Sequence, residues 1–141
     1  MDETLKREII MEHYQNPLNR HIIEDESYVK VNTSNASCID NLDLYLKIED
    51  NKILDVAFTG EACAISISST SIMIENLIGK TIEEAKIIIE NFENMINERK
   101  YDEKVLKNAL VYNENYKQNS RKTCAFLPYR GIREALDKYE K

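Results

Sequence analysis

The sequence predicts an α+β fold, in which a small antiparallel three-stranded sheet carries helices packed on one face. Two patterns support this class: alternating apolar and polar residues cluster between residues 28 and 58, whereas helical spacing dominates the second half of the chain. A length of 141 residues is that of one ordinary domain, and neither a linker nor an internal repeat interrupts it. We therefore expect a single domain over residues 1–141.

The first expected element is a helix over residues 2–15, followed by a short strand. Asn16-Pro17 ends the helical pattern, because a proline disfavours helical geometry in the residue before it. Val29 and Val31 then alternate with polar neighbours, which predicts the first strand. The apolar side chains that recur at helical spacing in the first segment are Leu5, Ile9, Ile10 and Tyr14.

The clearest strand pattern is a β-hairpin between residues 42 and 58. Asp50-Asn51-Lys52 supplies turn-forming residues between its two arms. Because strand side chains alternate between two faces, we expect one buried face on this hairpin. Its apolar members are Leu42, Leu44, Leu46, Ile48, Leu54, Val56 and Phe58.

A charge-free stretch of thirteen residues runs from Ala62 to Ile74, where a charged fraction of 31% would place about four charges. Its first residues alternate as a strand would. Further along, Ile67, Ser71, Ile74 and Ile78 fall on one helical stripe, and Gly79 stands in the place of a C-terminal stop. We expect a loop through Cys63 that leads into a helix.

Helices are expected over most of the remaining chain. Thr81 and Glu84 form a capping box that predicts a helix over residues 82–97. Residues 98–120 are polar, with apolar positions for only another helical turn or two, and residues 121–140 return to helical spacing.

The composition excludes several classes of partner. A net charge of −6 and a pI near 5.0 repel phosphate backbones, and no apolar run reaches the length of a membrane span. Nucleic acid and membrane are therefore not expected as partners. An odd count of three cysteines without a secretory signal predicts reduced thiols and a cytoplasmic protein.

The cysteines are the residues most able to carry chemistry. Cys38, Cys63 and Cys124 each lie at an expected loop or element boundary, and Asp40 follows the first of them by two residues. Thiolates suit zinc or iron–sulfur clusters, and a carboxylate can complete a tetrahedral set. The spacing contains no C-x-x-C pair, so three isolated, buried cysteines are the alternative.

The two histidines, His13 and His21, could also be metal ligands, since imidazole commonly binds zinc. We expect both of them to be surface groups instead.

Four motifs, in this order, resemble those of the iron–sulfur cluster assembly family that includes IscU and the N-terminal domain of NifU. They are HYQNPLN at 13–19, NASCID at 35–40, GEACAISISSTSIM at 60–73 and RKTCAFLPYRGIREAL at 121–136. The chain looks most like the SufU-like branch, because Thr123 replaces the histidine that precedes the last cysteine in IscU, and Arg121 stands three residues before Cys124. Sixty residues separate Cys63 from Cys124, so residues 98–120 resemble the SufU-type insertion.

The resemblance implies a zinc ion held by Cys38, Asp40, Cys63 and Cys124, with Cys38 accepting persulfide sulfur from a cysteine desulfurase. A histidine of the desulfurase would replace Cys38 on the metal, which frees the thiolate to attack. Arg121 would help to dock the desulfurase. Downstream iron–sulfur assembly proteins are the further partners that the family implies.

The resemblance also explains the charge-free stretch. The loop would present Cys63 to the metal, and Ala64, Ser66, Ser68 and Ser69 would let the first helical turns pack closely against the sheet.

Three family glycines are absent, with His21, Ile39 and Ala62 in their places. A β-branched residue between Cys38 and Asp40 resists the backbone freedom that glycine would give there. Two other readings therefore stay open: a scaffold that assembles a [2Fe–2S] cluster on the same residues and hands it on, and a degenerate member that is retained for interaction alone.

Overall fold

The computed structural model describes residues 1–36 and 39–140, which form one three-stranded sheet and a set of helices. The strands are β1 (Val29–Ser34), β2 (Asn41–Glu49) and β3 (Lys52–Glu61), antiparallel in the order β1-β2-β3. The predicted α+β class is confirmed. The α-helices are α1 (Glu3–Gln15), α2 (Ala64–Leu77), α3 (Ile82–Ile96), α4 (Glu103–Leu106) and α5 (Asn119–Glu140); two 3₁₀ helices, η1 (Lys107–Tyr112) and η2 (Asn115–Lys117), precede α5.

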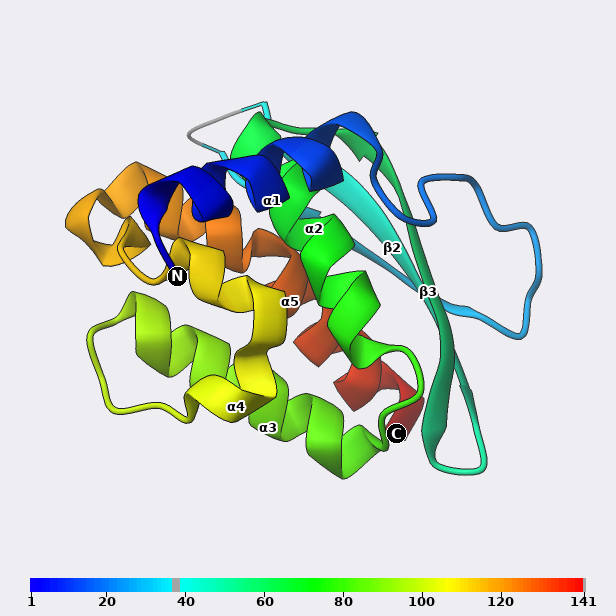
Figure 1. The fold of residues 1–141 in the computed structure, drawn as a ribbon. Helices are drawn as coiled ribbons and strands as arrows, with labels where there is room; N and C mark the ends of the chain where they lie inside the picture. Colours follow the sequence, from blue (N-terminus) through cyan, green and yellow to red (C-terminus); the bar gives the residue numbers. More distant parts are fainter. Residues whose placement is uncertain (37–38, 141) are drawn as a thin grey trace.

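The helices gather on one face of the sheet in two tiers (Figure 1). In the inner tier α5 packs on β1 and β2, while α2 packs on β3 and on α5. In the outer tier α1 covers α2, and α3 packs on α5. Within residues 1–36 and 39–140, no helix has the length and apolar character needed to cross a membrane.

The β2–β3 hairpin turns where the sequence predicts, but one of its predicted core residues is wrong. Asp50 and Asn51 both have positive φ, 53° and 64°, as a two-residue hairpin turn requires. A register shift beside Ile48 then exchanges the two faces at the start of β3. Ile53 is therefore fully buried, and Leu54 is 47% exposed.

Helix α1 occupies the predicted residues, but its buried face differs from the predicted apolar stripe. Leu5 and Tyr14 at the two ends of that stripe are exposed, whereas Lys6 and His13 are buried. Nδ1 of His13 lies 2.7 Å from Oγ of Ser71 on α2. The expectation that His13 is a surface group is therefore wrong, while His21 is exposed as predicted.

The charge-free stretch forms a loop and then a helix, as predicted, and α2 is buried on nearly all sides. Its hydroxyl groups form hydrogen bonds with the surrounding helices. Ser69 Oγ donates to the carbonyl of Ala125 on α5 at 2.6 Å, and Ser68 Oγ pairs with the hydroxyl of Tyr112 on η1. The small residues thus pack α2 closely against helices as well as against the sheet.

Residues 98–118 are more ordered and more deeply packed than their polar composition predicts. Helices α4 and η1 pack against α3 and α2, and they bury Leu106, Ala109 and Tyr112 in the main core.

Helix α3 begins at the predicted capping box, in which Thr81 and Glu84 exchange both hydrogen bonds.

Gly131 sets the distance between α5 and the sheet. A Cβ atom at this position would lie 2.4 Å from Leu44 Cδ1 and 3.0 Å from Thr33 Cγ2, closer than side chains pack. Leu44 is fully buried, so its end cannot move into solvent.

We expect Gly131→Ala to lower the free energy of unfolding by about 1–3 kcal/mol, because overpacking a well-filled core is destabilising. Helix propensity alone would have the opposite effect, since alanine favours a helix over glycine by about 1 kcal/mol. A loss of stability would therefore point to the packing. Urea denaturation followed by circular dichroism measures the change. The exposed Glu134→Ala on the same helix is the control and should change stability by less than about 0.5 kcal/mol; a stabilised Gly131→Ala would contradict this packing.

Candidate metal centre

Three of the predicted ligands converge from three separate parts of the fold. Asp40 lies immediately before β2, Cys63 immediately before α2, and Cys124 on the second turn of α5. One ligand atom from each lies within 4.8 Å of the other two. The cluster forms where the sheet meets the inner helices, so the packing of α2 and α5 on the sheet positions it.

Cys63 is held in place by its role as the N-cap of α2. Its backbone is extended, with φ −67° and ψ 166°, and its sulfur accepts a hydrogen bond from the Ser66 amide at 3.5 Å. A side chain that accepts from the N3 amide is the normal N-cap arrangement, although sulfur is a weak acceptor. The sulfur is therefore directed back over the helix N-terminus, where the helix dipole favours a negative charge.

Asp40 is buried, only 2% exposed, and both oxygens of its carboxylate accept hydrogen bonds. The Cys63 amide donates to Oδ1 at 2.7 Å, and the Ser66 hydroxyl donates to Oδ2 at 2.7 Å. Burial alone would raise the pKa of Asp40, but these donors, joined by the thiols of Cys124 and Cys63, bring its pKa below the usual value. Asp40 is thus held as a carboxylate, the form that binds a metal.

Cys124 is buried beside two other acidic groups. Burial raises the pKa of its thiol, and the neighbouring Cys63 and Asp40 raise that pKa further. Three acids so close together cannot all ionise without a cation. Two thiols and a carboxylate make a donor set that suits zinc, which holds tetrahedral ligands roughly 3.5–4 Å apart. The residues therefore fit a zinc ion.

Cys38, the fourth predicted ligand and the predicted sulfur acceptor, lies outside the described residues. Its neighbour Ile39 is 71% exposed. An open hollow of about 490 Å³ lies next to the centre, and Ile39, Ala62 and Tyr14 are among the residues that line it. The centre is therefore close to solvent on this side.

Arg121 lies on the first turn of α5, three residues before Cys124, and its side chain is exposed. In the described part of the chain no hydrogen bond or ion pair joins it to Asp40, Cys63 or Cys124. Its role in docking a partner stays a prediction.

Sequence reasoning missed two polar residues that support the ligands. Ser66 donates to Asp40 and also lies 3.1 Å from the carbonyl of Cys124, so one hydroxyl contacts the residues of two ligands. Asn35 Nδ2 lies 3.9 Å from the sulfur of Cys124. The position of Ser66 three residues after an N-capping cysteine was the available signal, but a serine in a serine-rich helix looks like packing alone.

Comparison with known proteins identifies relatives over nearly the whole chain. A family model described as the NifU-like N-terminal domain matches residues 5–141. The zinc-dependent sulfurtransferase SufU of Bacillus subtilis is 32% identical over 139 residues, which cover 98% of this chain and 93% of its relative. The iron–sulfur cluster assembly scaffold protein IscU of Thermotoga maritima is 37% identical over 114 residues, 81% of this chain and 80% of its own.

Solved structures agree with the fold. A putative iron–sulfur cluster assembly scaffold protein for the SUF system from Fervidobacterium islandicum AW-1 superposes with a TM-score of 0.88 at 34% identity, covering 96% of this chain and 99% of its own. A nitrogen-fixing NifU-like N-terminal protein from Brucella abortus has a TM-score of 0.81, with coverage of 94% and 92%. At 21% identity it supports the fold alone.

We expect Ser66→Ala to weaken metal binding about 10- to 100-fold, because it removes the hydroxyl that orients Asp40. Titration with Co²⁺, whose thiolate complexes absorb in the visible range, measures the affinity directly. The matched control is Ser69→Ala, which also deletes a buried hydroxyl of α2 but one that donates to Ala125. Equal Co²⁺ affinities in the two variants would show that Ser66 does not support the ligands.

Proposed function

The chain belongs to the NifU-like N-terminal domain family of iron–sulfur cluster assembly proteins, and on that premise we propose that it is a zinc-dependent sulfur-transfer protein. In this proposal it accepts persulfide sulfur from a cysteine desulfurase in the cytoplasm. The observation that carries the proposal is the convergence of Asp40, Cys63 and Cys124 within 4.8 Å. The relationship to the zinc-dependent sulfurtransferase SufU supports it.

Cys38 is the fourth ligand in this proposal. The three described donors leave one corner of a tetrahedron open, and Cys38 precedes Asp40 by two residues. Bound zinc would keep the cysteine sulfurs deprotonated at neutral pH. Ser66 and the Cys63 amide would hold the Asp40 carboxylate facing the other donors.

Cys38 is also the sulfur acceptor. Its thiolate attacks the outer sulfur of the desulfurase persulfide, and the old S–S bond breaks with its electron pair leaving on the desulfurase cysteine. The products are a persulfide on Cys38 and a thiolate on the desulfurase, so no external oxidant or reductant is required. A second exchange of the same kind delivers the sulfur: a thiolate of a downstream assembly protein attacks the outer sulfur of the Cys38 persulfide, and Cys38 leaves as a thiolate.

We assign Arg121 to desulfurase docking and residues 98–120 to a SufU-type insertion. The exposure of Arg121, one helical turn from Cys124, supports the first assignment. For the second, the support is the length of the interval between Cys63 and Cys124, in which residues 98–120 lie.

A second candidate is a scaffold that builds a [2Fe–2S] cluster on Cys38, Asp40, Cys63 and Cys124 and hands it on. The relationship to proteins named IscU scaffolds favours it. The two candidates share their ligands and differ in what those ligands hold, so metal content separates them.

We expect the protein purified without added metal or chelator to contain close to one zinc per chain by elemental analysis. Asp40→Ala should lower that content by more than half, because it removes one of about four ligands. The exposed Asp137→Ala on α5 is the control and should retain full zinc. Iron with labile sulfide in place of zinc would favour the scaffold, and neither metal would favour the degenerate member.

We expect the protein to stimulate turnover of a cysteine desulfurase in the presence of a reductant, and Cys38→Ala to abolish the stimulation. Stimulation that survives Cys38→Ala would overturn the sulfur-transfer proposal. Alkylation of the products followed by mass spectrometry should find the extra sulfur on Cys38.

A further inference from the structure

A cleft of about 410 Å³ lies between α1 and the segment that runs from η1 to the first turn of α5. We call it the basic cleft. Its charged residues are Glu3, Lys6, Arg7, Glu114, Lys117 and Arg121, and none of the described ligands Asp40, Cys63 and Cys124 lines it.

The basic cleft carries a charge opposite to that of the whole chain. Four cationic side chains and two carboxylates line it, which gives a local charge of +2, whereas the chain as a whole carries −6. Random placement in so acidic a protein would favour a negative cleft. The concentration of positive charge is therefore a local property of this site.

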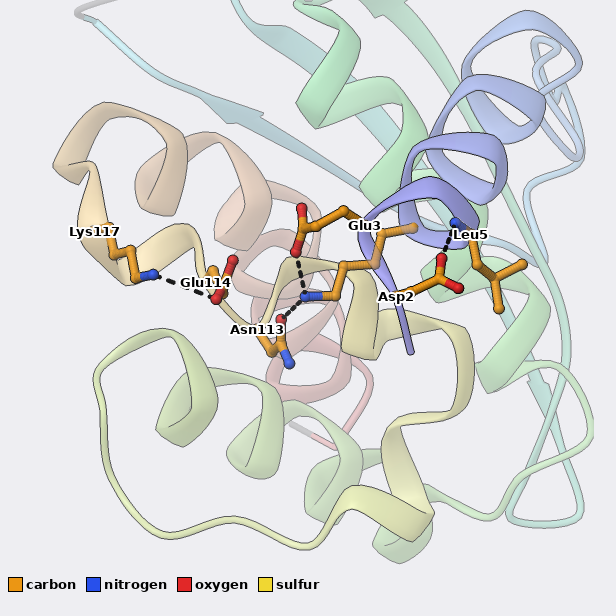
Figure 2. Close-up of polar contacts among 7 residues, drawn as sticks. Asp2, Glu3, Leu5, Asn113, Glu114 and Lys117 are labelled. Carbon is orange, nitrogen blue, oxygen red and sulfur yellow. Dashed lines mark hydrogen bonds and ion pairs between the residues drawn. The ribbon is translucent and has the colours of Figure 1, made fainter.

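Two of the cations are held by neighbours, and two remain available. Lys6 Nζ donates to Glu3 at 3.2 Å and to the Asn113 side chain at 2.7 Å, which ties α1 to the end of η1. Figure 2 shows Glu3 and Asn113 on either side of the ammonium group that donates to both, and it shows Lys117 paired with Glu114. By contrast, the guanidinium groups of Arg7 and Arg121 form no ion pair or hydrogen bond with the described residues.

The inner part of the basic cleft holds donors that lack enough acceptors. Lys6 is only 8% exposed, and its ammonium has three hydrogens for the two acceptors that contact it. Nδ2 of Asn115, which also lines the cleft, is buried and has no partner in the described part of the chain. An oxyanion bound beside Lys6 could accept the third hydrogen of its ammonium, which has no acceptor among the described residues.

One wall of the basic cleft is apolar. It is formed by Ile10 and Met11 of α1 and by Val111 of η1. A purely ionic ligand would gain nothing from this wall, whereas a ligand with a short hydrocarbon part would bury apolar surface against it.

We propose that the basic cleft binds a small organic dianion, with an oxyanion group facing the cations and a short apolar body against Ile10, Met11 and Val111. The local charge of +2 matches a phosphomonoester or a dicarboxylate. Guanidinium groups recognise both by paired hydrogen bonds. The volume lies within the range of small-molecule sites, about 300–1,000 Å³.

The inference does not depend on the metal centre or on sulfur transfer. The two proposals share Arg121 and part of the segment 98–120, so the tests use Arg7, which has no role in the proposed function. A variant of Arg7 that retains zinc and desulfurase stimulation but loses the anion separates the two proposals.

The first test is a nuclear magnetic resonance titration of the ¹⁵N-labelled full chain at low ionic strength in a buffer without phosphate. The probes are n-butyl phosphate, glutarate and inorganic phosphate. We expect one of the organic anions to cause saturable shifts confined to residues 3–11 and 107–121, with at least fivefold higher affinity than inorganic phosphate. Stronger binding of butyl phosphate identifies a phosphomonoester, and stronger binding of glutarate identifies a dicarboxylate.

The second test repeats the titration with Arg7→Gln, which should weaken binding at least fivefold. The control is Arg99→Gln, an exposed arginine outside the cleft, which should bind as the native chain does. Absence of saturable shifts, shifts elsewhere, equal affinity for inorganic phosphate, or equal effects of the two substitutions would each overturn the proposal.

Discussion

The hydrogen bonds that hold the buried Asp40 carboxylate are the interaction on which the centre depends. One comes from the Cys63 amide at the start of α2, and the other from the Ser66 hydroxyl one turn later. Together they attach the N-terminus of α2 to the end of the β1–β2 connection. Because Ser66 also contacts the carbonyl of Cys124, the same residue fixes α5 relative to both. The same hydrogen-bond network thus sets the geometry of the ligands and the packing of α2 and α5, so a change in one alters the other.

Most of the fold follows from local sequence patterns, and the exceptions have physical causes. The hairpin, the capping box of α3 and the loop into α2 lie where periodicity and turn residues predict them. The burial of Ile53 in place of Leu54 could not be predicted, because a register shift depends on how two strands pair. The prediction that His13 is exposed is wrong for a similar reason. Its burial depends on Ser71, 58 positions away, and periodicity carries no information about a polar partner at that distance.

Three of the four predicted ligands come together in the described structure, but the residues that support them were not predicted. Asp40, Cys63 and Cys124 stand out because thiolates are soft ligands that suit zinc and a carboxylate can complete its coordination, and the structure brings them together. Ser66 and Asn35 do not stand out, since serine and asparagine are common and act here only through geometry. Cys38 stays a prediction, and the basic cleft had no sequence signal, because its charges come from segments about a hundred positions apart.

The separation of the described donors along the chain affects how the protein could choose its metal. Asp40, Cys63 and Cys124 are spaced by 23 and 61 positions, so before folding they are isolated groups on long flexible loops. An ion captured at that stage would be held by one or two thiols and exchanged readily. Only the folded chain presents a carboxylate together with two sulfurs. Discrimination among metal ions is therefore a property of the folded state, and tight binding of the ion requires complete folding.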